Sequence, residues 1–127
     1  MKEITEDHCD FETAKLLMEK GFDEKTDFVF YYYEEDDGWT FEKLLPGDKF
    51  DKDKMIHCPT QALAMKWLRE VHNICISVDV KIGGGKYYVC ISSTENGLSH
   101  DVLEDEVWDT FEKACEVAIK YCLENLV

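Results

Sequence analysis

The sequence predicts an α+β fold in which three helices pack on a largely antiparallel sheet of about four strands. Apolar residues recur at helical spacing in three segments, and in other segments they alternate with polar residues. Turn residues, rather than long crossovers, separate consecutive strand segments. The predicted order is therefore α-β-β-α-β-β-α. Residues 1–127 form one predicted domain, in which residues 1–9 are a candidate disordered N-terminus.

The first predicted helix spans residues 11–20, because apolar side chains gather on one helical face. These side chains are Phe11, Ala14, Leu17 and Met18. Asp10 is suited to cap the N-terminus of the helix. Gly21 is suited to end it in the left-handed conformation, with Phe22 packing back on the last turn.

Residues 27–34 predict a strand with both faces covered, because aromatic and β-branched residues follow one another over too short a length for a helix. Glu35, Asp36, Asp37 and Gly38 supply a turn. A weaker strand pairs back as a hairpin through the alternating residues Trp39, Phe41 and Leu44. Residues 46–57 alternate Asp and Lys with little apolar material, so we expect a solvated connection.

The second predicted helix begins after Thr60, its expected N-cap, and ends at about His72. Its expected inner face is Ala64, Trp67, Leu68 and Val71. Residues 74–80 then alternate aliphatic with polar side chains, which is the pattern of a strand with one face in the core.

Three glycines at 83–85 permit the positive φ angles of a chain reversal, so residues 87–91 return as the partner strand. After a turn at Asn96 and Gly97, Asp109 and Glu112 form a possible capping box for a third helix. The expected inner face of this helix is Phe111, Ala114, Cys115, Ala118 and Cys122.

The net charge of -14, from 28 acidic and 14 basic residues, is the strongest departure from an average composition. Acidic residues cluster at 23–27, 34–37 and 101–106. Such a surface repels nucleic acid and anionic membranes and attracts basic proteins. The alternative stays open that the charge only keeps a small protein dissolved and monomeric.

The six cysteines are predicted to be reduced thiols of a cytoplasmic protein, because the first residues lack the pattern of a secretory signal. Cys75 lies in a strand pattern and Cys115 and Cys122 in a helical one, as thiols used as small apolar side chains do. Nowhere do 18 apolar residues run together, so no membrane-spanning helix is expected.

No metal, cofactor or catalytic residue is predicted. Zinc-like pairs occur at His8-Cys9, at His57-Cys58 and between His72 and Cys75, but no C-x-x-C motif accompanies them. Residues 48–53 share only their charge with a calcium loop. The glycines at 83–85 precede a strand and not the helix N-terminus that a phosphate site requires.

Catalysis by a cysteine is disfavoured, because the negative background raises thiol pKa values. Exposed acidic runs such as 34–37 are usually a solvated turn. A small enzyme that combines residues distant in sequence stays an alternative, with His57, His72 and carboxylates near the second hairpin as candidates.

The first hairpin is the predicted protein-contact surface or dimer interface, because its aromatic residues exceed what a core needs. The predicted surface consists of Tyr31, Tyr33, Glu34, Glu35, Asp36, Asp37 and Trp39. A stacking platform for single-stranded nucleic acid would instead require positive charge around the rings.

Three segments carry a family resemblance: FETAKLL with KGFD in residues 11–23, PTQALAMKWLREVH in 59–72, and FEKACE to LENL in 111–126. They resemble a family of short, uncharacterised proteins of gut bacteria, their phages and mobile elements. The resemblance covers most of the chain and is most specific in 59–72. It implies a small accessory protein, phage-derived or carried by a mobile element, and it brings no activity.

The leading functional hypothesis is therefore a non-enzymatic protein-binding or regulatory module whose partner is another, basic protein. An inhibitor that imitates the phosphate array of DNA is an alternative, since the surface is strongly acidic. The small enzyme described above is the third hypothesis.

Overall fold

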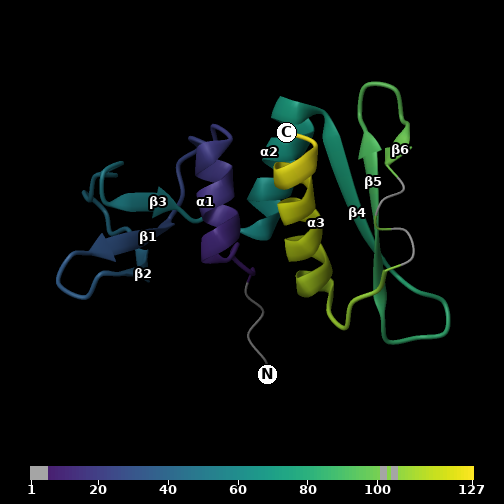
Figure 1. Ribbon diagram of the computed structural model, residues 1–127, viewed down its shortest axis with the longest axis horizontal. Helices are drawn as coiled ribbons and strands as arrows, with labels where there is room; N and C mark the ends of the chain where they lie inside the picture. The colour runs from purple at the N-terminus through teal and green to yellow at the C-terminus, as the bar shows by residue number, and fades with distance from the viewer. Residues whose placement is uncertain (1–5, 101–102, 104–105) are drawn as a thin grey trace.

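The computed structural model describes residues 6–100, 103 and 106–127. Figure 1 shows three helices lying between two sheets. The helices are α1 (Phe11–Glu19), α2 (Gln61–His72) and α3 (Phe111–Asn125). The strands are β1 (Phe28–Tyr33), β2 (Gly38–Lys43), β3 (Met55–His57), β4 (Ile74–Val80), β5 (Tyr87–Ser93) and β6 (Ser99–His100).

The α+β class, the antiparallel pairing and the order of the main elements are as predicted, but the strands form two sheets and not one. The strand orders are β2-β1-β3 and β4-β5-β6. The prediction of a single sheet of about four strands is wrong because the helices lie between the two hairpins (Figure 1). Helices α2 and α3 pack on β4, while α1 packs on β3.

The strand β3 falls within residues 46–57, which the sequence analysis treated as a solvated connection. Ile56 pairs with Phe30 of β1 and is 4% exposed. A strand of three residues is too short to show an alternating pattern, so only its pairing with β1 reveals it.

The predicted starts of the first two helices are confirmed. Asp10 Oδ1 accepts a hydrogen bond from the Thr13 N–H at 2.8 Å. Thr60 Oγ1 accepts one from the Leu63 N–H at 3.1 Å. Gly21, with a φ of 97°, follows α1 as predicted.

The start of α3 differs by one residue from the predicted capping box. Thr110 is the N-cap, and its Oγ1 accepts a hydrogen bond from the Lys113 N–H at 3.0 Å. Asp109 pairs instead with Lys86, in the loop between β4 and β5. Asp109 and Thr110 are adjacent and both are good N-cap residues, so tertiary contacts decide which of them caps the helix.

Three residues assigned to inner helix faces are about half exposed. Met18, Val71 and Phe111 are 44%, 54% and 42% exposed. Helical periodicity gives the angle of a side chain around the helix axis, whereas the neighbouring elements decide which turns are covered. Thr13, Gln61 and Glu116 are the polar residues buried in these helices.

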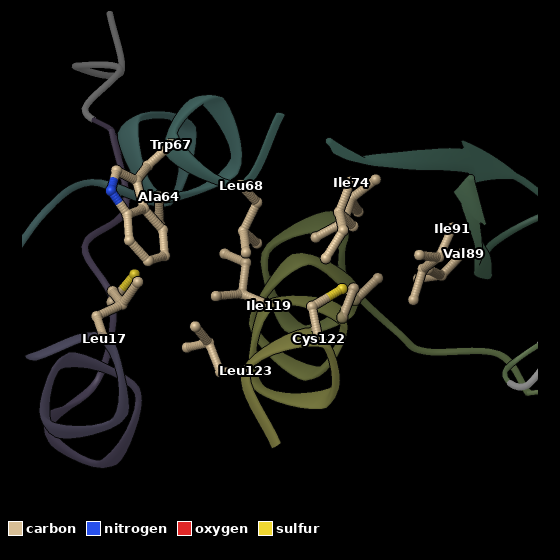
Figure 2. Close-up of a cluster of buried hydrophobic side chains, with 14 of the residues drawn as sticks. Leu17, Ala64, Trp67, Leu68, Ile74, Val89, Ile91, Ile119, Cys122 and Leu123 are labelled. Carbon is tan, nitrogen blue, oxygen red and sulfur yellow. The ribbon is translucent and has the colours of Figure 1, made fainter. Parts of the chain in front are cut away.

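The main core lies between the helices and the second sheet. Figure 2 shows Ile119 and Leu123 of α3 pointing toward Leu68 and Leu17, while Cys122 points toward Ile74. Val89 and Ile91 of β5 complete this cluster. No strand residue of the first sheet belongs to it, although Val29 and Ile56 are buried elsewhere.

The segment before α1 lies against the segment before α2. The Cys9 N–H donates to the Pro59 carbonyl at 3.0 Å, and the Gln61 N–H donates to the Asp7 carbonyl at 2.8 Å. Residues 7–9 of the candidate disordered N-terminus are therefore paired with residues 59–61, whereas residues 1–5 lie outside the described residues.

A buried carboxylate on α3 joins the starts of the other two helices. Glu116, 9% exposed, accepts hydrogen bonds from the Asp10 N–H at 3.2 Å and from Gln61 Nε2 at 3.0 Å. Gln61 Nε2 also donates to the Glu112 carbonyl at 2.9 Å. The side chain of one residue thus fixes α1 and α2 relative to α3.

Replacement of this carboxylate tests the junction. We expect Glu116→Ala to lower the free energy of unfolding by about 2 kcal/mol, because two donors lose their buried acceptor. Glu124→Ala, at an exposed position of the same helix, is the matched control and should change it by less than about 0.5 kcal/mol. The free energies are measured by urea unfolding. An equal decrease in the free energy of unfolding of the two variants would show that Glu116 does not hold the helices together.

Candidate functional site

One face of the first sheet carries a continuous row of aromatic rings. Opposite residues of antiparallel strands share a face, so the register aligns Phe30 with Phe41 and Tyr32 with Trp39. Phe28 stacks on Phe41 with ring centroids 4.8 Å apart. The centroids of Tyr32 and Trp39 are 5.2 Å apart. We call these five residues the aromatic face.

Part of the aromatic face is supported by the chain around α1, and part of it is open. The Phe11 ring lies 5.3 Å from those of both Phe30 and Trp39. The His8 ring lies 4.7 Å from that of Phe28. Trp39 and Phe41 remain 39% and 48% exposed. Trp39 and Phe41 therefore pack against other rings on one side and are exposed to solvent on the other.

An acidic turn, residues 34–37, joins β1 to β2 next to the aromatic face. All four side chains are exposed. The Tyr32 hydroxyl donates to the Asp37 carboxylate. The Tyr33 hydroxyl donates to both carboxylate oxygens of Glu42 at 2.9 and 2.8 Å. These hydrogen bonds raise the pKa of both phenols above the ordinary tyrosine value, so both keep their protons at neutral pH.

The surface predicted from the sequence is divided between two faces. The structure brings the acidic turn and Trp39 together at one end of the hairpin. Tyr31 and Tyr33, with ring centroids 4.6 Å apart, point to the opposite face of β1, because side chains alternate along a strand. They line a shallow depression of about 350 Å³ with Val29 and Met55.

The sequence analysis left four residues of the aromatic face out of the predicted surface: Phe28, Phe30, Tyr32 and Phe41. These residues could have been identified from the length of the turn, because the turn length sets the register of the two strands. A turn of four residues pairs Tyr33 with Gly38, and counting back from this pair places Tyr32 opposite Trp39.

The two histidines proposed for a small enzyme do not meet. His57 lies in a depression of about 220 Å³, stacked on Phe50 with centroids 3.8 Å apart. Burial lowers its pKa below the ordinary histidine value. His72 packs against Trp67 at 4.7 Å, and Phe22 lies between Trp67 and His57. Two aromatic rings therefore separate the two histidines.

Of the carboxylates near the second hairpin, Glu95 lines a depression of about 180 Å³ together with His72, and it accepts a hydrogen bond from Asn73 Nδ2 at 2.8 Å. The Asp79 carboxylate accepts a hydrogen bond from the Val80 N–H at 2.9 Å on the exposed end of β4. The two histidines therefore line different depressions, His57 with Phe50 and His72 with Glu95.

All six cysteines are free thiols, and four of them are buried. Burial raises the pKa of Cys58 and Cys122 to about 12 and that of Cys115 to about 11. Burial and the nearby Glu116 also raise the pKa of Cys9. Thiols with such pKa values are protonated at neutral pH and are poor nucleophiles.

The side chains of the zinc-like pair His8-Cys9 lie in different surroundings. The His8 ring faces the aromatic face, whereas the Cys9 carbonyl accepts a hydrogen bond from Cys58 Sγ at 3.2 Å. Within residues 6–100, 103 and 106–127, no group of three or more His, Cys, Asp or Glu side chains is placed to hold a metal ion. Over the same residues, no helix is long and apolar enough to cross a membrane.

Comparison of the chain with protein-family models, curated proteins and solved structures finds no match. The resemblance to short proteins of gut bacteria and their phages therefore stays a prediction.

Thiol reactivity tests the burial of the cysteines. We expect Cys90, the exposed cysteine, to react first with a chromogenic disulfide reagent at pH 8. The four buried thiols should react only as the fold opens. Cys90→Ser should remove the fast phase, and denatured protein should titrate as six thiols. Fast reaction of the buried thiols in the native protein would contradict the structure.

Proposed function

We propose that the protein is a non-enzymatic binding module that engages a basic segment of another protein through its aromatic face and acidic turn. The observation that carries the proposal is the exposure of Trp39 and Phe41 directly beside residues 34–37. Arginine and lysine side chains bind over aromatic rings, where the ring quadrupole attracts the cation. Carboxylates next to the rings attract the same cations.

The charge of the whole chain supports a basic partner. A net charge of -14 raises the local concentration of cations and speeds the encounter with a positive surface. The same charge repels membranes of anionic lipid and nucleic acid. An accessory or regulatory role fits both this chemistry and the family resemblance.

The aromatic face favours this proposal over an inhibitor that imitates DNA. A phosphate array offers negative charge on a regular backbone. It has no counterpart to Trp39 and Phe41, which present apolar rings to the partner. A protein that binds through rings as well as charges selects partners whose shape fits the rings, and it does not bind every basic surface.

A fluorescent arginine-rich peptide provides the test. We expect it to bind the protein in an anisotropy titration, and an acidic peptide of equal length to show no binding. Trp39→Ala and Phe41→Ala should each weaken binding by about tenfold, as truncation of a central aromatic residue does at interfaces. Triple replacement of Glu34, Glu35 and Asp36 by their amides should weaken binding and reduce its dependence on salt.

The matched control is Tyr88→Ala, which removes a ring with 36% exposure from the second sheet. It should leave the affinity unchanged. Equal affinity of the wild-type protein and the Trp39→Ala and Phe41→Ala variants would overturn the proposed site. Absence of peptide binding would overturn the proposed function.

A further inference from the structure

The outer side of β2 is an unpaired edge of the first sheet. The strand order is β2-β1-β3, and no strand of the described residues pairs with the outer side of β2. Figure 1 shows β2 on the far side of β1 from β3. The edge lies immediately beside the aromatic face and the acidic turn.

The hydrogen-bonding direction of each residue in β2 follows from the ladder with β1. The Leu44 N–H donates to the Asp27 carbonyl at 2.8 Å, one residue beyond the end of β2. Bonding directions alternate along antiparallel strands, so Glu42 and Thr40 also bond to β1. The backbone groups of Trp39 and Phe41 therefore point outward from the sheet.

Natural proteins protect exposed edges with proline, bulges or charged side chains. The register of β1 and β2 is continuous from Phe28↔Lys43 to Tyr33↔Gly38, so β2 contains no bulge. It contains no proline, and its charged residues are Glu42 and Lys43 at the end away from the acidic turn. The Glu42 carboxylate is held within the sheet by the hydroxyls of Tyr33 and Thr40. The strand β4, one edge of the other sheet, is partly protected: the Asp79 carboxylate accepts a hydrogen bond from the outward N–H of Val80, which is then not available to an added strand.

We infer that the basic segment binds in an extended conformation and adds to the β2 edge as a fourth strand of the first sheet. This inference rests on the proposed function and adds the conformation of the partner. Backbone hydrogen bonds to Trp39 and Phe41 hold the added strand, as in other complexes formed by strand addition.

The side chains of the added strand alternate between the two faces of the sheet. Residues opposite Trp39 and Phe41 lie on the aromatic face, where arginine or lysine stacks on the rings. The residues between them lie on the side of Thr40 and Glu42, where a short polar side chain fits the edge. The partner is thus a segment with basic residues at every second position.

Charge argues for a basic partner and against a second copy of this chain. Two copies carry -14 each and repel one another. An arginine-bearing strand has the opposite charge and neutralises the turn at 34–37. The edge can therefore remain free in the isolated protein and still accept a suitable partner.

Selective methylation of the peptide backbone tests the inference. The probe is a nine-residue peptide that alternates arginine and threonine, with N-methyl groups on every arginine in one version and on every threonine in the other. Strand addition uses the N–H groups of alternate residues only. We expect one version to lose about tenfold or more in affinity and the other to stay close to the parent, because two or three hydrogen bonds are lost in the first.

Amide hydrogen exchange supplies an independent readout. The N–H groups of Trp39 and Phe41 should exchange more slowly with the parent peptide bound, while those of Ile76 and Val78 on the β4 edge should not change. Equal affinities of the two methylated peptides, with the parent still binding, would overturn strand addition and leave the proposed function standing. Loss of all binding would overturn both. If the protein without peptide were a dimer in light scattering, and if the N–H groups of the β2 edge were already protected from exchange, a second copy and not a basic segment would occupy the edge.

Discussion

The arrangement of the helices depends on one buried carboxylate. Glu116 lies on α3 and accepts hydrogen bonds from the first residue of α2 and from the capping residue of α1. Burying this carboxylate costs free energy unless both donors are well placed. The hydrogen bonds therefore favour one arrangement of the three helices. The apolar side chains of α3 then pack on both sides, toward α1 and α2 and toward the second sheet (Figure 2).

The first sheet stands outside this core, and that position explains its aromatic content. It is stabilised by ring contacts, by the support of Phe11 and by the burial of Val29 and Ile56. Aromatic rings bury a large area with few residues, which suits a sheet that lacks a thick apolar layer. The same rings, where α1 does not cover them, leave Trp39 and Phe41 available to a partner.

The sequence predicts local structure well here and tertiary arrangement less well. The caps at Asp10 and Thr60 and the glycine turn after β4 depend on neighbouring residues, and all three are confirmed. The division into two sheets depends on where the helices pack, which periodicity does not report. For the candidate site, the acidic turn and Trp39 follow from the sequence. The partners of Trp39 require the register, which a single miscounted residue would invert.

Mapping of a bound peptide onto the protein tests the central claim most directly. In nitrogen-15 NMR spectra, titration with the arginine–threonine peptide should shift the amide signals of residues 28–43 and the indole signal of Trp39. The signals of α2 and β4 should stay in place. Shifts spread evenly over the acidic surface, or concentrated on the second sheet, would contradict a binding site on the aromatic hairpin.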